Sequence, residues 1–278
     1  MMDATLNDID AVFLDLDGTM YLGSDLIPGA IDFLDRCSER GVQRFFLSNN
    51  SSRSVSQYLK KLDGFGIPAT ADDVLLSTHD LISWLHGFDY DRVYLVGTEG
   101  MRQMLEDEGL TMDAENPEIV VLGYDTEITY EKISTASIHM HKGVPMVVSH
   151  PDVVCPSPDG GLPDTGAFMA MFEATTGVKP IHVCGKPEPG MILHRIKSLG
   201  LDPARCAMVG DRLYTDMAMA TRAGVNGILV LSGEATMEDV GALPNGAEQQ
   251  PSLIVESVDD LLRRRRCRKG PKINVVGP

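Results

Sequence analysis

The sequence AVFLDLDGT, at residues 11–19, decides the fold of this chain. An apolar run leads directly into two acids, Asp15 and Asp17. In an extended backbone, residues two apart point to the same side, so both carboxylates face one way while Leu14 and Leu16 face the other. The stretch therefore predicts a buried strand that ends in a pair of carboxylates.

Short apolar runs of this kind alternate with helical patterns along most of the chain, which is typical of a parallel sheet covered by helices. Strands are expected at 11–14, 42–47, 92–96, 119–123, 145–149, 181–184, 206–209, 227–231 and 253–255. Helices are expected at 28–41, 54–62, 99–108 and 130–142, with a last one starting at Ser257. The sequence predicts the α/β class with a Rossmann-like parallel sheet.

A chain of 278 residues exceeds the usual size of one domain. We expect a core formed by residues 1–80 and 181–266, interrupted by an inserted α/β domain at 81–180. Residues 267–278 are expected to form a flexible tail. We assign no function to the basic run 263–269.

The composition is that of an ordinary globular protein, with 43% hydrophobic and 23% charged residues. A formal net charge of -16 disfavours nucleic acid polymers and anionic membranes as partners. No apolar run is long enough to span a membrane. The five cysteines show no close pairing, so we expect free thiols and a cytoplasmic protein.

Polar clusters follow four of the predicted strands. In open parallel sheets, ligands bind at the carboxyl ends of the strands, so these clusters are expected to share one site. The clusters are Asp15 to Thr19, Ser48 to Asn50, Gly185 to Pro187, and Gly210 to Arg212 with Asp216 just beyond.

The paired aspartates suit phosphoryl transfer. An ionised Asp15 is a competent nucleophile toward phosphorus, and covalent capture divides one slow hydrolysis into two faster steps. Asp17 can protonate the leaving oxygen and then activate water.

The remaining polar side chains suit the same reaction. Carboxylates beside a phosphate require a cation, and hard oxygen ligands favour Mg²⁺, to which Asp211 would contribute. Lys186 would neutralise the nucleophile and the transferring oxygens, while Ser48 and the backbone amide of Asn49 would hold those oxygens. Asp216 would orient Lys186 or a water on the magnesium.

These motifs closely resemble those of the haloacid dehalogenase (HAD) superfamily. Asp15 to Thr19 is similar to its first motif, Ser48 to its second, Lys186 to its third, and Asp211 with Asp216 to its fourth. The large insert and the segment Asn49 to Ser54 resemble the NagD-like branch, which includes p-nitrophenyl phosphatases.

The resemblance implies a HAD fold with a cap domain at 81–180. It also implies that Asp15, the carbonyl of Asp17 and Asp211 hold Mg²⁺. Cap residues are expected to touch the leaving group, which makes His150 and Asp152 candidate specificity residues. A homodimer formed through the caps is implied as well.

The function predicted is hydrolysis of a small phosphomonoester, of the sugar phosphate or nucleoside monophosphate type, through an aspartyl-phosphate. Two alternatives stay open. A phosphotransferase or phosphomutase would use the same intermediate with a sugar hydroxyl as acceptor. A catalytically silent metabolite-binding protein could share the fold.

Overall fold

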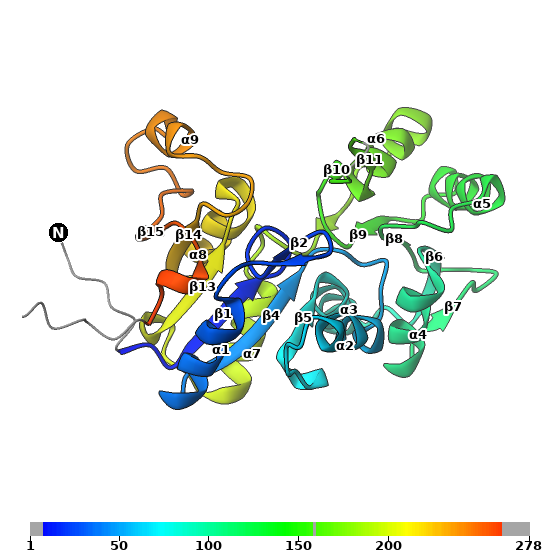
Figure 1. The fold of residues 1–278 in the computed structure, drawn as a ribbon. Helices are drawn as coiled ribbons and strands as arrows, with labels where there is room; N and C mark the ends of the chain where they lie inside the picture. Colours follow the sequence, from blue (N-terminus) through cyan, green and yellow to red (C-terminus); the bar gives the residue numbers. More distant parts are fainter. Residues whose placement is uncertain (1–7, 158–159, 263–278) are drawn as a thin grey trace, which may run out of the picture.

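The structure of the protein, a computed structural model, describes residues 8–157 and 160–262. A six-stranded sheet runs in the order β15-β14-β13-β1-β4-β5, and a five-stranded sheet runs in the order β12-β9-β8-β6-β7. Figure 1 shows the two sheets in separate halves of the molecule, with β1 and β4 in blue and β6, β8 and β9 in green. The predicted α/β class is confirmed.

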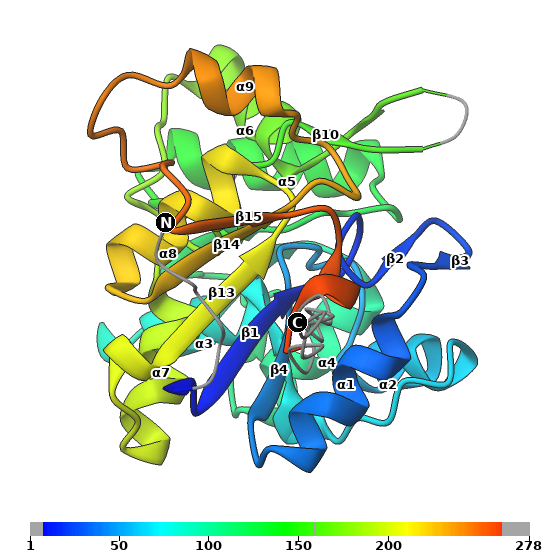
Figure 2. The same cartoon turned by 60° about the vertical axis from the view of Figure 1, so that its left-hand side comes forward.

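The first sheet is parallel throughout (Figure 2). Its strands are β1 (Ala11–Asp15), β4 (Gln43–Ser48), β5 (Val74–Leu76), β13 (Cys206–Gly210), β14 (Asn226–Val230) and β15 (Leu253–Val255). All five residues of β1 are buried, because helices cover both faces of the sheet.

Alternate residues of β1 supply the two faces. Val12 and Leu14 belong to a buried cluster with α1 (Ala30–Glu39) and α2 (Val55–Gly64). Phe13 belongs to a second cluster with α7 (Gly190–Leu199) and α8 (Ala218–Ala223). The strand is thereby fixed in register, and its terminal carboxylate is fixed with it.

The second sheet is also parallel. Its strands are β6 (Arg92–Val96), β7 (Thr111–Met112), β8 (Ile119–Leu122), β9 (Met146–Val148) and β12 (His182–Val183). Its helices are α4 (Glu99–Asp107), α5 (Tyr130–His141) and α6 (Thr165–Thr176). We refer to this unit as the cap.

The core and the cap share apolar packing. The buried cluster that contains Leu14 also contains Leu81 and Leu85 of α3 (Ser77–Gly87), and it continues to Val93 and Leu95 of β6. Helix α3 therefore packs against both units at the point where the chain leaves the core.

Short elements complete the described chain. Two hairpins are formed by β2 (Tyr21–Leu22) with β3 (Asp25–Leu26), and by β10 (Val154–Cys155) with β11 (Leu162–Pro163). Helical turns are found at η2 (Ala71–Asp73), η3 (Pro203–Arg205), η4 (Leu213–Met217) and η5 (Val258–Asp260), and α9 (Met237–Ala242) follows β14.

Two predictions are wrong. The strand expected at 181–184 as part of the core pairs instead with β9, as β12 of the cap sheet, and β5 forms the edge of the core sheet. The helix expected from Ser257 is, within the described residues, only the turn η5, which Ser257 caps. The tail 267–278 and the basic run 263–269 lie outside the described residues.

The predicted domain limits stay predictions, although one limit, between residues 80 and 81, falls inside α3. The described cysteines, Cys37, Cys155, Cys184 and Cys206, are free thiols. Across 8–157 and 160–262, every helix is too short or too polar to cross a membrane.

Candidate active site

Three neighbouring strands, β13, β1 and β4, bring the predicted site residues to one edge of the core sheet. Asp15 is the last residue of β1, Ser48 is the last residue of β4, and Asp211 directly follows β13. A cleft of about 230 Å³ opens at this edge. Its lining includes Asp15, Asp17, Ser48, Asn49, Lys186 and Arg212 from the core side, with Asp152, Cys155 and Asp164 from the cap side.

Lys186 lies at the centre of the buried charges. Its ammonium group donates to Asp15 Oδ1 and, at 2.7 Å, to Asp216 Oδ1. Burial alone would favour the neutral amine, but the two carboxylates outweigh it and raise the pKa of Lys186. The lysine is therefore held as a cation beside Asp15.

A carboxylate cluster lies beside this lysine. Ligand oxygens of Asp15, Asp211 and Asp216 all lie within 4.8 Å of one another. Burial, reinforced by the charges of Asp15 and Asp216, raises the pKa of Asp211. Within the described residues, the buried Oδ1 atom of Asp211 has no hydrogen-bond partner.

These features fit a hard divalent cation. A cation would satisfy the unpartnered oxygen of Asp211 and offset the repulsion among the acids. The backbone also packs closely around Asp211, since a Cβ at Gly18 or Gly233 would lie 2.3 or 2.0 Å from its Oδ2 atom. Asp216 is already engaged, because its oxygens accept from Lys186 and from the Arg212 amide.

Asp17 lies in the turn after β1 and its side chain is exposed to the cleft. The surrounding protein desolvates it and raises its pKa, with Lys61 opposing and Asp15 adding to the shift. A carboxyl group with a raised pKa is suited to donate a proton. The structure thus distinguishes the two aspartates: Asp15 pairs with Lys186, whereas Asp17 has a raised pKa and faces the cleft.

Ser48 faces the cleft with its hydroxyl 2.8 Å from the Tyr58 hydroxyl. Burial raises the pKa of Tyr58 to about 12, so the phenol stays protonated and can donate. The neighbouring Asn49 is 6% exposed, and its side-chain amide bonds to the backbone of Lys186. The segment that contains Ser48 and Asn49 is therefore hydrogen-bonded directly to the segment that contains Lys186.

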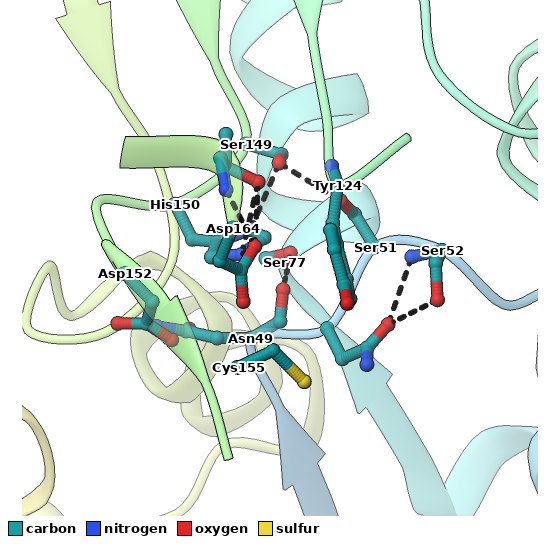
Figure 3. A network of polar contacts seen from close by, with 12 residues as sticks. Asn49, Ser51, Ser52, Ser77, Tyr124, Ser149, His150, Asp152, Cys155 and Asp164 are labelled. Carbon is teal, nitrogen blue, oxygen red and sulfur yellow. Dashed lines mark hydrogen bonds and ion pairs between the residues drawn. The ribbon is translucent and has the colours of Figure 1, made fainter. Parts of the chain in front are cut away.

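The two cap residues predicted to touch substrate are placed differently (Figure 3). Asp152 lines the cleft. His150 has no exposed surface, and its ring nitrogens contact Ser149 Oγ at 2.9 Å and Asp164 Oδ1 at 3.0 Å. In this arrangement His150 supports the cleft-lining Asp164 and does not itself face the cleft.

Sequence reasoning missed several residues of the lining. Arg53 and Lys61 enter the cleft from the loop after β4 and from α2. Asp164 caps α6 by accepting from the Thr165 amide at 2.6 Å. An aspartate before a helical stretch is a recognisable cap, but its position beside the cleft depends on tertiary structure.

Two family models match this chain. A family model described as haloacid dehalogenase-like hydrolase matches residues 12–111. A second model of HAD-like hydrolases matches residues 183–261.

Named relatives match most of the chain. It is 36% identical over 226 residues to the 5'-nucleotidase YutF of Bacillus subtilis. This match covers 81% of this chain and 88% of that protein. It is 36% identical over 234 residues to an acid sugar phosphatase of Staphylococcus aureus, covering 83% of this chain and 89% of that protein.

Solved structures of phosphatases superpose on this chain. A 4-nitrophenylphosphatase from Thermotoga maritima superposes with a TM-score of 0.88 at 38% identity, covering 93% of this chain and 98% of that one. A glycerol phosphate phosphatase from Mycobacterium tuberculosis, solved in complex with magnesium, superposes with a TM-score of 0.87 at 28% identity. The match covers 94% of this chain and 79% of that one.

Proposed function

The chain belongs to the haloacid dehalogenase-like hydrolases and is a phosphatase, and we propose that it cleaves a small phosphomonoester through an aspartyl-phosphate on Asp15. The observation that carries this proposal is the buried contact of Lys186 with Asp15 at the edge of the cleft, with Asp17 two residues away. The proposal thus assigns a nucleophile, its neighbouring cation and a proton donor to one cleft.

In the first step, an oxygen of Asp15 attacks phosphorus, and the bond between phosphorus and the leaving oxygen breaks. Asp17 donates its proton to that oxygen, so the alcohol leaves neutral. In the second step, Asp17 takes a proton from water, which attacks phosphorus and releases phosphate from Asp15. The raised pKa of Asp17 supports the proton transfer in the first step.

The other core residues stabilise the transferring group. Lys186 balances the charge of Asp15 and of the phosphoryl oxygens, and Asp216 keeps its ammonium group in place. Ser48 Oγ and the backbone amide of Asn49 are proposed donors to the same oxygens. The roles of Lys186, Ser48 and Asn49 rest on their position at the cleft, and that of Asp216 rests on its buried contact with Lys186.

Mg²⁺ is the cofactor of this phosphatase. Asp15, the backbone carbonyl of Asp17 and Asp211 would hold it, and it would supply positive charge against the phosphate. The support in this chain is the carboxylate cluster with its unpartnered Asp211 oxygen.

The cleft favours a compact leaving group with hydroxyls. Its volume of about 230 Å³ is below the usual range of pocket volumes for drug-sized ligands, which begins at about 300 Å³. Asp152 and Asp164 offer carboxylate acceptors on the cap side. Of the sugar phosphate and nucleoside monophosphate classes, we favour the sugar or polyol phosphates.

The test is phosphate release from sugar phosphates, nucleoside monophosphates and p-nitrophenyl phosphate, with Mg²⁺ and with EDTA. We expect release that requires Mg²⁺ and is fastest with a sugar or polyol phosphate. Transfer of phosphate to a second sugar without release would favour a phosphotransferase, and absence of any turnover would favour a silent binding protein.

Two further expectations remain proposals. A homodimer through the caps is tested by sedimentation of the full chain and of cap-surface variants. A cytoplasmic location is tested by fractionation of cells that express the chain.

A further inference from the structure

The side chain of Asn49 holds the backbone of Lys186 through both the amide and the carbonyl of that residue. Its Oδ1 atom accepts from the Lys186 amide at 2.7 Å, and its Nδ2 atom donates to the Lys186 carbonyl at 3.0 Å. Two antiparallel hydrogen bonds to one residue fix its orientation as well as its position. The base of the Lys186 side chain is thus set by Asn49.

The same amide reaches the cap. Its Nδ2 atom also donates to Asp152 Oδ2 at 3.2 Å, and the two hydrogens of an amide nitrogen serve both acceptors. Figure 3 shows Asn49 and Asp152 end to end below the cap residues. Asn49 therefore contacts both Asp152 of the cap and the core segment that carries Lys186.

The surroundings of Asn49 leave its side chain little freedom. The backbone carbonyl of Asn49 accepts from Ser77 Oγ at 2.6 Å, and Ser77 begins the helix that leads to the cap. On the other side, a Cβ at Gly185 would lie 2.8 Å from Asn49 Oδ1, and Gly185 has a positive φ of 69°. Asn49 touches both chain segments that connect the core to the cap.

We propose that Asn49 is a positioning residue that aligns Lys186 with Asp15 and transmits the position of Asp152 in the cap to this lysine. The proposal rests on the role of Lys186 proposed above. It is separate from the donor role proposed for the Asn49 backbone amide, because a side-chain substitution leaves that amide in place.

Ser51 provides a matched control in the same loop. It is fully buried, and its hydroxyl contacts Ser149 of the cap at 3.0 Å and accepts from the Tyr124 amide at 2.8 Å. It thus links the core loop to the cap as Asn49 does, while both of these partners, Ser149 and Tyr124, lie outside the segment that carries Lys186. A loss caused only by loosening the cap would appear in both variants.

The experiment measures kcat and KM with p-nitrophenyl phosphate and Mg²⁺. We expect Asn49→Ala to lower kcat about 10²-fold, because small misplacements of a catalytic group cost this much. We expect Ser51→Ala to stay within about fivefold of wild type, which corresponds to about 1 kcal/mol. In a Lys186→Arg background, Asn49→Ala should cost less than tenfold, because the residue it positions is already altered.

The link to the cap is tested by exchanging donor and acceptor. Asn49→Asp removes the donor to both Asp152 and the Lys186 carbonyl and places two carboxylates together, so kcat should fall. The loss at the Lys186 carbonyl is the same with and without a change at Asp152, so a comparison of the single and double variants isolates the link to the cap. Combining it with Asp152→Asn restores a donor and acceptor pair and should recover at least tenfold in kcat. This pair also serves if Asn49→Ala fails to fold, which thermal unfolding and circular dichroism reveal.

The possible results are distinguishable. A wild-type protein that releases no phosphate contradicts the proposed function itself. An active wild type with Asn49→Ala within threefold of its kcat, or with equal losses in wild-type and Lys186→Arg backgrounds, overturns the positioning role. Failure of the exchange to recover kcat overturns the link to Asp152.

Discussion

The Nζ atom of Lys186 lies 2.7 Å from Asp216 Oδ1, and both side chains are buried. The other oxygen of Asp216 accepts from the Arg212 amide at 3.1 Å. Asp216 is therefore a fixed anchor that leaves the ammonium group free to reach Asp15. A buried ion cluster of this kind is costly to break, because removal of one partner leaves a charge without compensation.

Removal of the Lys186 charge should therefore affect both stability and catalysis. We expect Lys186→Met in EDTA to lower the free energy of unfolding by about 3–5 kcal/mol and to abolish turnover. Urea denaturation and phosphate release measure the two effects. Lys179→Met is the control, since Lys179 pairs with Glu173 on the surface and should change stability by less than about 1 kcal/mol. Equal stability of the two variants would contradict the buried-cation account.

Magnesium should stabilise the folded protein through Asp211. At a concentration about 100 times Kd, Mg²⁺ is expected to add about 2.7 kcal/mol to the free energy of unfolding. In Asp211→Asn this gain should disappear, and the variant without metal should be more stable than the wild type without metal, because one repelling charge is gone. Thermal unfolding with and without EDTA checks both. An exposed substitution on α2, Asp63→Asn, should respond to Mg²⁺ as the wild type does.

The acid stability of the fold should depend on His79. Burial, helped by Arg195, lowers the pKa of His79 to about 4, while its Nδ1 atom accepts from the Leu76 amide at 3.0 Å. Since the unfolded chain binds the proton more readily, the free energy of unfolding should fall as pH decreases from about 6.5 to about 4.

The contribution of His79 to this loss should be about 1–3 kcal/mol. His79→Gln keeps an acceptor for Leu76 and removes the titration, so its stability should change less over this range. Urea titrations at several pH values provide the comparison. Identical pH profiles for the two proteins would show that His79 is not the group responsible.

Specificity should depend on the cap carboxylates. We expect Asp152→Ala to lower kcat/KM for the preferred sugar or polyol phosphate about tenfold more than for p-nitrophenyl phosphate, because only the former offers hydroxyls to it. His150→Asn should shift the ratio in the same direction but less, since His150 acts by holding Asp164. If the ratio of kcat/KM for the two substrates stays at the wild-type value in both variants, the cap contact is excluded.

The sequence sufficed to predict which core side chains come together. The acids Asp15 and Asp17 are two residues apart in an apolar strand, and that local pattern already fixes which way they point. Ser48 and Asp211 follow equally clear strands, and the carboxyl ends of parallel strands meet at one edge. The structure places Asp15, Asp17 and Ser48 at one cleft and Asp211 beside Asp15.

Other features depend on contacts that no local pattern encodes. The apolar run before Lys186 forms a strand, but its pairing with β9 of the cap sheet is set by packing between distant segments. His150 was expected near substrate from the family resemblance, yet in the structure it is buried against Ser149 and Asp164. The double contact of Asn49 with Lys186 joins residues 137 positions apart.

The central claim is covalent capture of phosphate by Asp15, and the most direct test traps that intermediate. Protein mixed with p-nitrophenyl phosphate and Mg²⁺ is quenched in acid, reduced with borohydride and digested for mass spectrometry. An acyl phosphate on Asp15 is reduced to homoserine, so the account predicts this conversion at residue 15 and its absence in Asp15→Asn, which should also release no phosphate. Conversion at a different residue, or phosphate release by Asp15→Asn at the wild-type rate, would contradict it.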